Sequence, residues 1–188
     1  MEYFRKLELA LPLVSARGVK SCALTDGSAK CILSVGSRDS LLTTPFGCSS
    51  FGEEQTQRKT IEFRLPPQWV EHFLNFDAWA VAYLTEHSER LFKKLLTVDQ
   101  VKEMYKPTVT QRGSYPATLR CKLNIGGSTA VRSWNALDQR MTIPEDFRGY
   151  DLLPRVHISH LWVMSKEVGF VLNVHDCTCI QQSTECPF

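Results

Sequence analysis

Residues 154–176, PRVHISHLWVMSKEVGFVLNVHD, have the pattern of a long β-hairpin and decide how the rest of the chain must fold. Apolar side chains recur at period two on the first arm at Val156, Ile158, Trp162 and Met164, and on the second at Phe170, Leu172 and Val174. Residues 165–169 supply the turn between the arms. A single hairpin is at best marginally stable in water. Other strands or a helix must therefore cover this one.

Three upstream segments have strand patterns. Within residues 1–18 the leucines at 7, 9, 11 and 13 alternate, and Pro12 would confine such a strand to an edge. Residues 19–24 and 30–35 flank an Asp-Gly turn at 25–28, which is a strong short-range signal for a hairpin. In residues 59–65, Ile61, Phe63 and Leu65 alternate with polar side chains, which predicts a fourth strand.

The segment from about 66 to 105 predicts an inserted helical block. Pro66 and Pro67 suit the first turn of a helix, and apolar residues then repeat at spacings of three and four. We expect this helix to break or bend near Asn75–Asp77, giving two helical segments through about Lys94. Thr97 and Gln100 have the spacing of a capping box and predict a further, short helix up to about residue 105.

Downstream of the helices the pattern returns to strands. Residues 118–125 alternate, with Leu119, Cys121, Leu123 and Ile125 inward and Thr118, Arg120, Lys122 and Asn124 outward. After a turn at 126–128, residues 130–134 are expected to pair back onto this strand. Residues 135–151 are predicted to be a polar connection to the final hairpin.

These elements predict a mainly β (α+β) protein: an OB-like small β-barrel of short antiparallel strands with the helical block inserted. An α+β sandwich is the alternative. The length of 188 residues fits a single domain over residues 1–188. Residues 36–58 lack periodicity and predict a flexible loop, partly docked by Phe46 and Phe51. Residues 180–188 predict a polar tail.

The net charge is only +2, yet its distribution is uneven. Residues 106–166 carry nine Lys or Arg against four acids, a local net charge of +5. The seven cysteines are scattered, which favours reduced thiols and an intracellular location, in nucleus or cytoplasm. Glu8 and Pro12 interrupt the first apolar run, so a secretory signal is not expected. No apolar run reaches the length of a membrane span.

The basic positions give the best functional signal. Arg120 and Lys122 share the outer face of one predicted strand, and Arg132 and Trp134 share a face of the strand expected beside it. Cations that follow phosphates and a ring that stacks on a base are what single-stranded nucleic acid requires. The alternative is an ordinary solvated sheet face, because alternation alone places charge on an open face.

Metal-binding and catalytic patterns are weak. His175, Cys177, Cys179 and Cys186 are suitable ligand types, but paired zinc cysteines are usually two or more residues apart. Whether these three cysteines are free thiols stays open at this point. No nucleophile elbow, P-loop or paired-carboxylate motif occurs. We expect no metal, no cofactor and no enzymatic activity.

The stretch from 119 to 176 resembles the OB-fold single-stranded-DNA-binding proteins of large nucleocytoplasmic DNA viruses and their cellular relatives. The resemblance lies in LRCKLNI (119–125), a turn, a short strand with Trp134, a variable loop, and LLPRVHISHLWVMSKEVGFVLNV (152–174). In that pattern the first arm of the hairpin ends near Leu161-Trp162 and the second restarts at Gly169-Phe170. The resemblance implies an OB-type barrel that binds single strands with little regard to sequence.

The sequence therefore predicts a non-enzymatic single-stranded nucleic-acid (DNA) binding protein. Its predicted binding residues are Arg120, Lys122, Arg132, Trp134, Arg155, His157 and Lys166, the last three extending the groove. The alternative is an accessory subunit of a larger assembly, which would meet a protein partner through the 66–105 helices or the 36–58 loop. No membrane partner is expected.

Overall fold

The computed structural model describes residues 7–9, 13–14, 20–26, 29–50 and 57–182. The chain divides into two compact units of interleaved segments. The first unit comprises Met1–Cys31, Pro67–Thr110 and Ile158–Leu172, and the second comprises Ile32–Pro66, Gln111–His157 and Asn173–Phe188. Each unit is described by itself below. The single domain over residues 1–188 stays a prediction.

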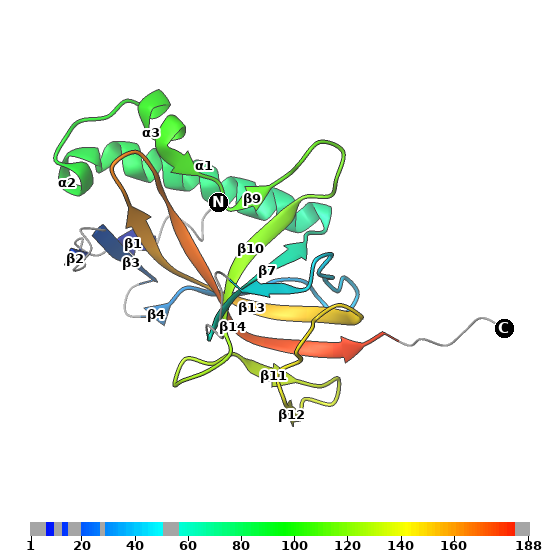
Figure 1. The fold of residues 1–188 in the computed structure, drawn as a ribbon. Coiled ribbons are helices and arrows are strands. Elements are labelled where there is room, and N and C mark those ends of the chain that lie inside the picture. The colour runs from blue at the N-terminus through cyan, green and yellow to red at the C-terminus, as the bar shows by residue number, and fades with distance from the viewer. Residues whose placement is uncertain (1–6, 10–12, 15–19, 27–28, 51–56, 183–188) are drawn as a thin grey trace. The chain divides into compact units, whose positions relative to one another are not determined.

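The predicted hairpin consists of β13 (Tyr150–Val163) and β14 (Val168–Gln181), which are neighbours in the sheet and contribute residues to both units (Figure 1). Val156 and Ile158 are buried as predicted, but the next buried residue is Leu161. The alternation therefore changes phase within β13, and the expectation that Met164 faces the core is wrong, since it is exposed. Trp162 is half-buried, against Gly169 of the opposite arm.

In the first unit, β3 (Lys20–Asp26) pairs antiparallel with β1 (Leu7–Leu9), β2 (Leu13–Val14), β4 (Ala29–Lys30) and the end of β13. The β3–β4 register, with Thr25 opposite Lys30, confirms the start of the predicted Asp-Gly hairpin. Its predicted return up to residue 35 is wrong. In the second unit, β5 (Ile32–Ser34) pairs with residues 155–157 of β13 instead. This pairing joins residues far apart in the sequence, so the local pattern of residues 30–35 does not reveal it.

The helical block belongs to the first unit and comprises α1 (Pro67–Glu86), α2 (Ser88–Phe92) and α3 (Val98–Met104). Thr97 and Gln100 form the predicted capping box. The predicted break at 75–77 is wrong, because α1 is continuous there. Asp77 is buried, and its carboxylate accepts hydrogen bonds from the Tyr105 hydroxyl (2.7 Å) and the Thr108 amide (3.0 Å).

The inner side of α1 packs against β14. The Phe76 and Phe170 ring centroids are 5.0 Å apart, and Trp79 lies 6.5 Å from the same phenylalanine. After α3, β8 (Tyr105–Lys106) pairs parallel with the start of β14, and β9 (Val109–Thr110) follows. The helices thus cover a face of the hairpin, which explains why Val168–Leu172 is buried without alternation.

The centre of the second unit is the antiparallel pair β7 (Arg58–Arg64) and β10 (Thr118–Asn124), seen side by side in Figure 1. β6 (Cys48–Ser50) pairs with β7, and β14 pairs parallel with β10 at Asn173. The inward residues of both central strands are buried as predicted: Ile61, Phe63, Leu119, Cys121 and Leu123.

The strand expected to pair back onto β10 is β11 (Arg132–Trp134), and this pairing is wrong. β11 pairs parallel with β14 and antiparallel with β12 (Arg140–Met141), a strand that lies inside the predicted polar connection. The side chain of Asn135 closes the β11–β12 turn, since its Oδ1 accepts from the amides of Leu137 and Gln139, each at 2.9 Å. β12 has only two residues, which is too short for alternation to be recognised in the sequence.

The segment predicted as a flexible loop contains β6 and residues of three isolated bridges: Ser37 to Ser40, Leu42 to Leu152 and Thr43 to Arg64. Leu42 is buried, whereas Phe46 is 71% exposed, so the expectation that Phe46 docks the loop is wrong. Phe51 and residues 183–188 of the predicted tail lie outside the described residues. The flexibility of the loop stays a prediction.

Strands joined by one helical block confirm the mainly β, α+β class, and the arrangement is compatible with an OB-like fold. Where the structure describes the chain, none of its helices has both the length and the hydropathy needed to cross a membrane.

Candidate nucleic-acid interface

The outer surface of β7 and β10 is unusually rich in cations. Alternation places Arg58, Thr60, Glu62 and Arg64 on the outer side of β7, and the antiparallel register places Arg120 opposite Glu62 and Lys122 opposite Thr60. Arg112, in the segment before β10, joins this surface beside Arg120. We call the set Arg58, Arg64, Arg112, Arg120 and Lys122, together with Glu62, the basic face.

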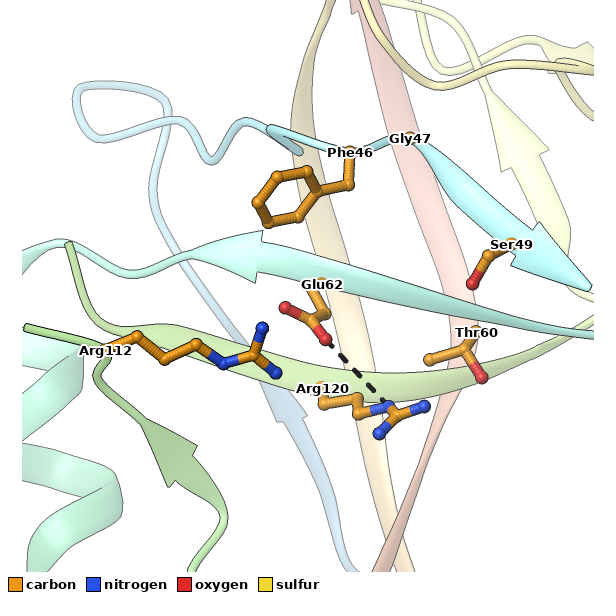
Figure 2. Close-up of a pocket in the computed structure, with 7 residues that line it drawn as sticks. All are labelled: Phe46, Gly47, Ser49, Thr60, Glu62, Arg112 and Arg120. Carbon is orange, nitrogen blue, oxygen red and sulfur yellow. Dashed lines mark ion pairs between the residues drawn. The ribbon is translucent and has the colours of Figure 1, made fainter. Parts of the chain in front are cut away.

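A pocket of about 240 Å³ opens on the basic face. It is lined by Phe46, Gly47, Ser49, Thr60, Glu62, Arg112 and Arg120. Figure 2 shows the Phe46 ring on one side of Glu62 and the guanidinium groups of Arg112 and Arg120 on the other. An aromatic ring, two planar cations and two hydroxyl groups therefore converge on one hollow of the surface.

The Phe46 ring is exposed, but a hydrogen bond fixes the backbone beside it. Thr44 Oγ1 donates to the carbonyl of Gly47 at 3.0 Å. Gly47 has a φ of +65°, and a Cβ there would approach Asp146 Oδ1 to 2.5 Å. Asp146 is fixed by Arg148, whose Nε donates to it at 2.6 Å, and these hydrogen bonds lower the pKa of Asp146. The turn thus presents the ring from a defined position.

The positive charge of the basic face is only partly compensated. Glu62 Oε1 lies 4.0 Å from Arg120 Nε, which is the long limit of an ion pair, and the Arg120 side chain is 54% exposed. Among the described residues, no carboxylate forms an ion pair with Arg64, Arg112 or Lys122. Three cations of the basic face therefore have no ion pair with a described carboxylate.

A second cluster of predicted residues lies further along β14. Arg132 Nη2 is 2.9 Å from His175 Nε2 and 3.1 Å from Asp176 Oδ2, and Arg155 Nη1 is 3.3 Å from the same carboxylate oxygen. The Asp176 side chain is 6% exposed. The structure thus brings Arg132 and Arg155 together over one buried acid, which cancels part of their charge.

The basic face and this cluster are linked through β14. Lys122 is in register with Asn173, and residue 175 lies two positions further on the same face of that strand. Further along β14, Arg132 is in register with Asp176, and its guanidinium contacts the His175 ring.

The other predicted residues are distributed as follows. Trp134 is half-buried on β11, with the Arg140 guanidinium 5.8 Å from its ring centroid. His157 is half-buried on β13 opposite Ile32. Lys166 lies in the β13–β14 turn, which belongs to the first unit, so it is not among the residues that the second unit brings together.

Sequence reasoning missed five residues of this interface. Arg58, Glu62 and Arg64 could have been found, because they alternate with the buried residues of β7. Phe46 and Arg112 stand in stretches without periodicity, where no local signal distinguishes an exposed functional residue from a docked one. Among the described residues, no group of three or more His, Cys, Asp or Glu side chains is placed to hold a metal ion, and the absence of a metal stays a prediction.

Among solved structures, the chain is similar in fold to a single-stranded DNA binding protein encoded by bacteriophage T7, gp2.5. The TM-score is 0.52 at 12% sequence identity, and the match covers 85% of this chain and 91% of that one. No family model and no curated protein matches the sequence.

Proposed function

We propose that this protein is a non-enzymatic single-stranded DNA binding protein that holds the strand on the basic face. The observation that carries the proposal is the pocket in which the exposed Phe46 ring stands beside Arg112 and Arg120. The similarity to gp2.5, which binds single-stranded DNA, supports the same class of ligand.

The chemistry favours a single strand over a duplex. A ring at the surface can stack only on a base whose face is open, and bases in a duplex are covered by their neighbours. The cations of the basic face are spread along β7 and β10, where they would follow the phosphates of a strand that crosses both. Arg132, Trp134, Arg155 and His157 would extend this path along β14, and a role for Lys166 stays a prediction.

The test is a titration of a fluorescently labelled oligonucleotide of about 20 nucleotides, longer than a typical site, followed by anisotropy at low salt. The wild-type protein should bind the single strand and bind the matching duplex more weakly. The variant Arg120→Glu/Lys122→Glu reverses two adjacent charges on β10 and should lose most of the binding. Both side chains are exposed, so circular dichroism should show an intact fold.

The matched control is Lys94→Glu/Lys102→Glu, which changes the net charge equally on exposed residues of the first unit. It should bind nearly as well as wild type. Absence of binding by wild type at micromolar protein and low salt would refute the proposed function. Equal losses in the two variants would show that net charge, not the basic face, determines affinity.

Several finer expectations stay predictions: a closed OB barrel, membership of the viral family resembled by residues 119–176, and an intracellular location. A protein partner is a second proposal, favoured by the exposed apolar side chains of Leu74, Leu95 and Val98 in and between the helices. If these residues bind a partner or another copy, the isolated protein should self-associate in light scattering, and replacing all three with polar residues should reduce this.

A further inference from the structure

We infer that Glu62 gives the pocket a preference among bases, favouring those that present amino groups over thymine. The inference rests on the proposed function and specifies the ligand of the same pocket.

Glu62 occupies an unexpected position for a surface that only attracts phosphates. It is the acidic residue among the seven that line the pocket, and it stands between two arginines. Its carboxylate would repel a phosphate placed there and would weaken purely electrostatic binding. A carboxylate at this point would favour binding only if it contacts a base.

The strand fixes where the carboxylate lies. Glu62 is in the middle of β7, paired across to Arg120, and its side chain is only 22% exposed. Its ion pair with Arg120 is 4.0 Å long, so the carboxylate keeps most of its capacity to accept hydrogen bonds. A base stacked on Phe46 would turn its edge toward Glu62, as the placement in Figure 2 indicates.

An ionised carboxylate accepts hydrogen bonds and donates none. Cytosine, adenine and guanine present amino groups, and a carboxylate that accepts from the N4 amino group of cytosine is a known pairing. Thymine has the O4 carbonyl oxygen where cytosine has its N4 amino group, and this oxygen would face the carboxylate unfavourably. Glu62 should therefore increase the affinity of the pocket for cytosine relative to its affinity for thymine.

The test compares oligo-dC and oligo-dT binding to wild type and Glu62→Gln, at about pH 8 to keep cytosine unprotonated. Both oligonucleotides carry single-ring bases, and glutamine has the size of glutamate but offers a donor as well as an acceptor. The ratio of the two affinities should change about fivefold between the proteins, corresponding to ~1 kcal/mol for one base contact. Comparing ratios cancels any intrinsic difference in stacking between the two bases.

The control is Glu103→Gln, which removes an exposed carboxylate of α3 in the first unit and should leave the ratio at its wild-type value. If wild type binds both oligonucleotides but Glu62→Gln leaves their ratio unchanged, the inference is overturned and the proposed function stands. The same holds if Glu62→Gln strengthens both affinities equally, because Glu62 would then act only through its charge. Absence of binding to either oligonucleotide overturns both.

Discussion

Salt dependence offers a quantitative test of how many cations of the basic face contact phosphates. The informative change is Arg112→Gln/Lys122→Gln, since both side chains are exposed and neither forms an ion pair with a described carboxylate. Surface substitutions of this kind usually change the free energy of unfolding by no more than about 0.5 kcal/mol. An effect on binding would therefore not reflect loss of the fold.

The expected magnitude follows from the number of cations. If each of the five neutralises one phosphate, log K against log salt should have a slope of about −3.5, at ~0.7 per contact for a single strand. Removing two cations should reduce the slope to about −2.1. Between about 50 and 200 mM salt, wild type would then lose affinity about 100-fold and the variant only about 20-fold.

Anisotropy titrations at four or more salt concentrations measure both slopes, with Lys94→Gln/Lys102→Gln as the variant of equal net charge. The control should keep the wild-type slope, because its lysines are not among the cations of the basic face. A variant slope equal to that of wild type would refute the reasoning, since it would mean that neither Arg112 nor Lys122 releases a counterion on binding. A reduced slope in the control would point instead to a general effect of charge.

Three further changes test other parts of the structure. Phe46→Ala should weaken single-strand binding by about 5- to 150-fold, the equivalent of ~1–3 kcal/mol for one stacked base, while the fold is retained; an unchanged Kd would exclude stacking on this ring. Gly47→Ala should lower the free energy of unfolding by at least about 1–2 kcal/mol, because residue 47 has positive φ and the added methyl meets Asp146; urea denaturation measures this, and unaltered stability would contradict the geometry. Burial raises the pKa of Asp77, so its contribution to stability is largest below its unfolded pKa near 3.8 and declines as pH rises toward the folded pKa. Compared with wild type, Asp77→Asn should become relatively more stable as pH rises through that window, and a stability difference independent of pH would show that Asp77 titrates alike in both states.

The parts of the fold that alternation governs could be predicted. β7 and β10 each bury one face over several residues, so Arg120 and Lys122 were placed outward from sequence alone. The Thr97 capping box was predictable for a similar reason, because its hydrogen bonds are local. Partner choice was not predictable: β5 and β11 each pair with the long hairpin strands, and these contacts join residues far apart in the sequence.

The candidate site could be predicted only in part, because it too depends on contacts between residues far apart in the sequence. Alternation identifies an outward residue, but not what it meets. Arg132 and Arg155 were correctly read as polar positions, yet their shared contact with Asp176 depends on how three strands come together. The exposure of Phe46 depends on the turn at Gly47 and its packing against Asp146, neither of which leaves a periodic signal.

The buried carboxylate beneath Arg132 and Arg155 also has an entropic consequence. A free arginine side chain has about 2 kcal/mol of rotamer entropy to lose when it is immobilised. Asp176 restricts both guanidinium groups before any ligand arrives, and His175 adds a further contact to Arg132. A phosphate that reached this cluster would therefore meet side chains whose ordering was completed during folding, so that even a half-neutralised pair of arginines could contribute to affinity.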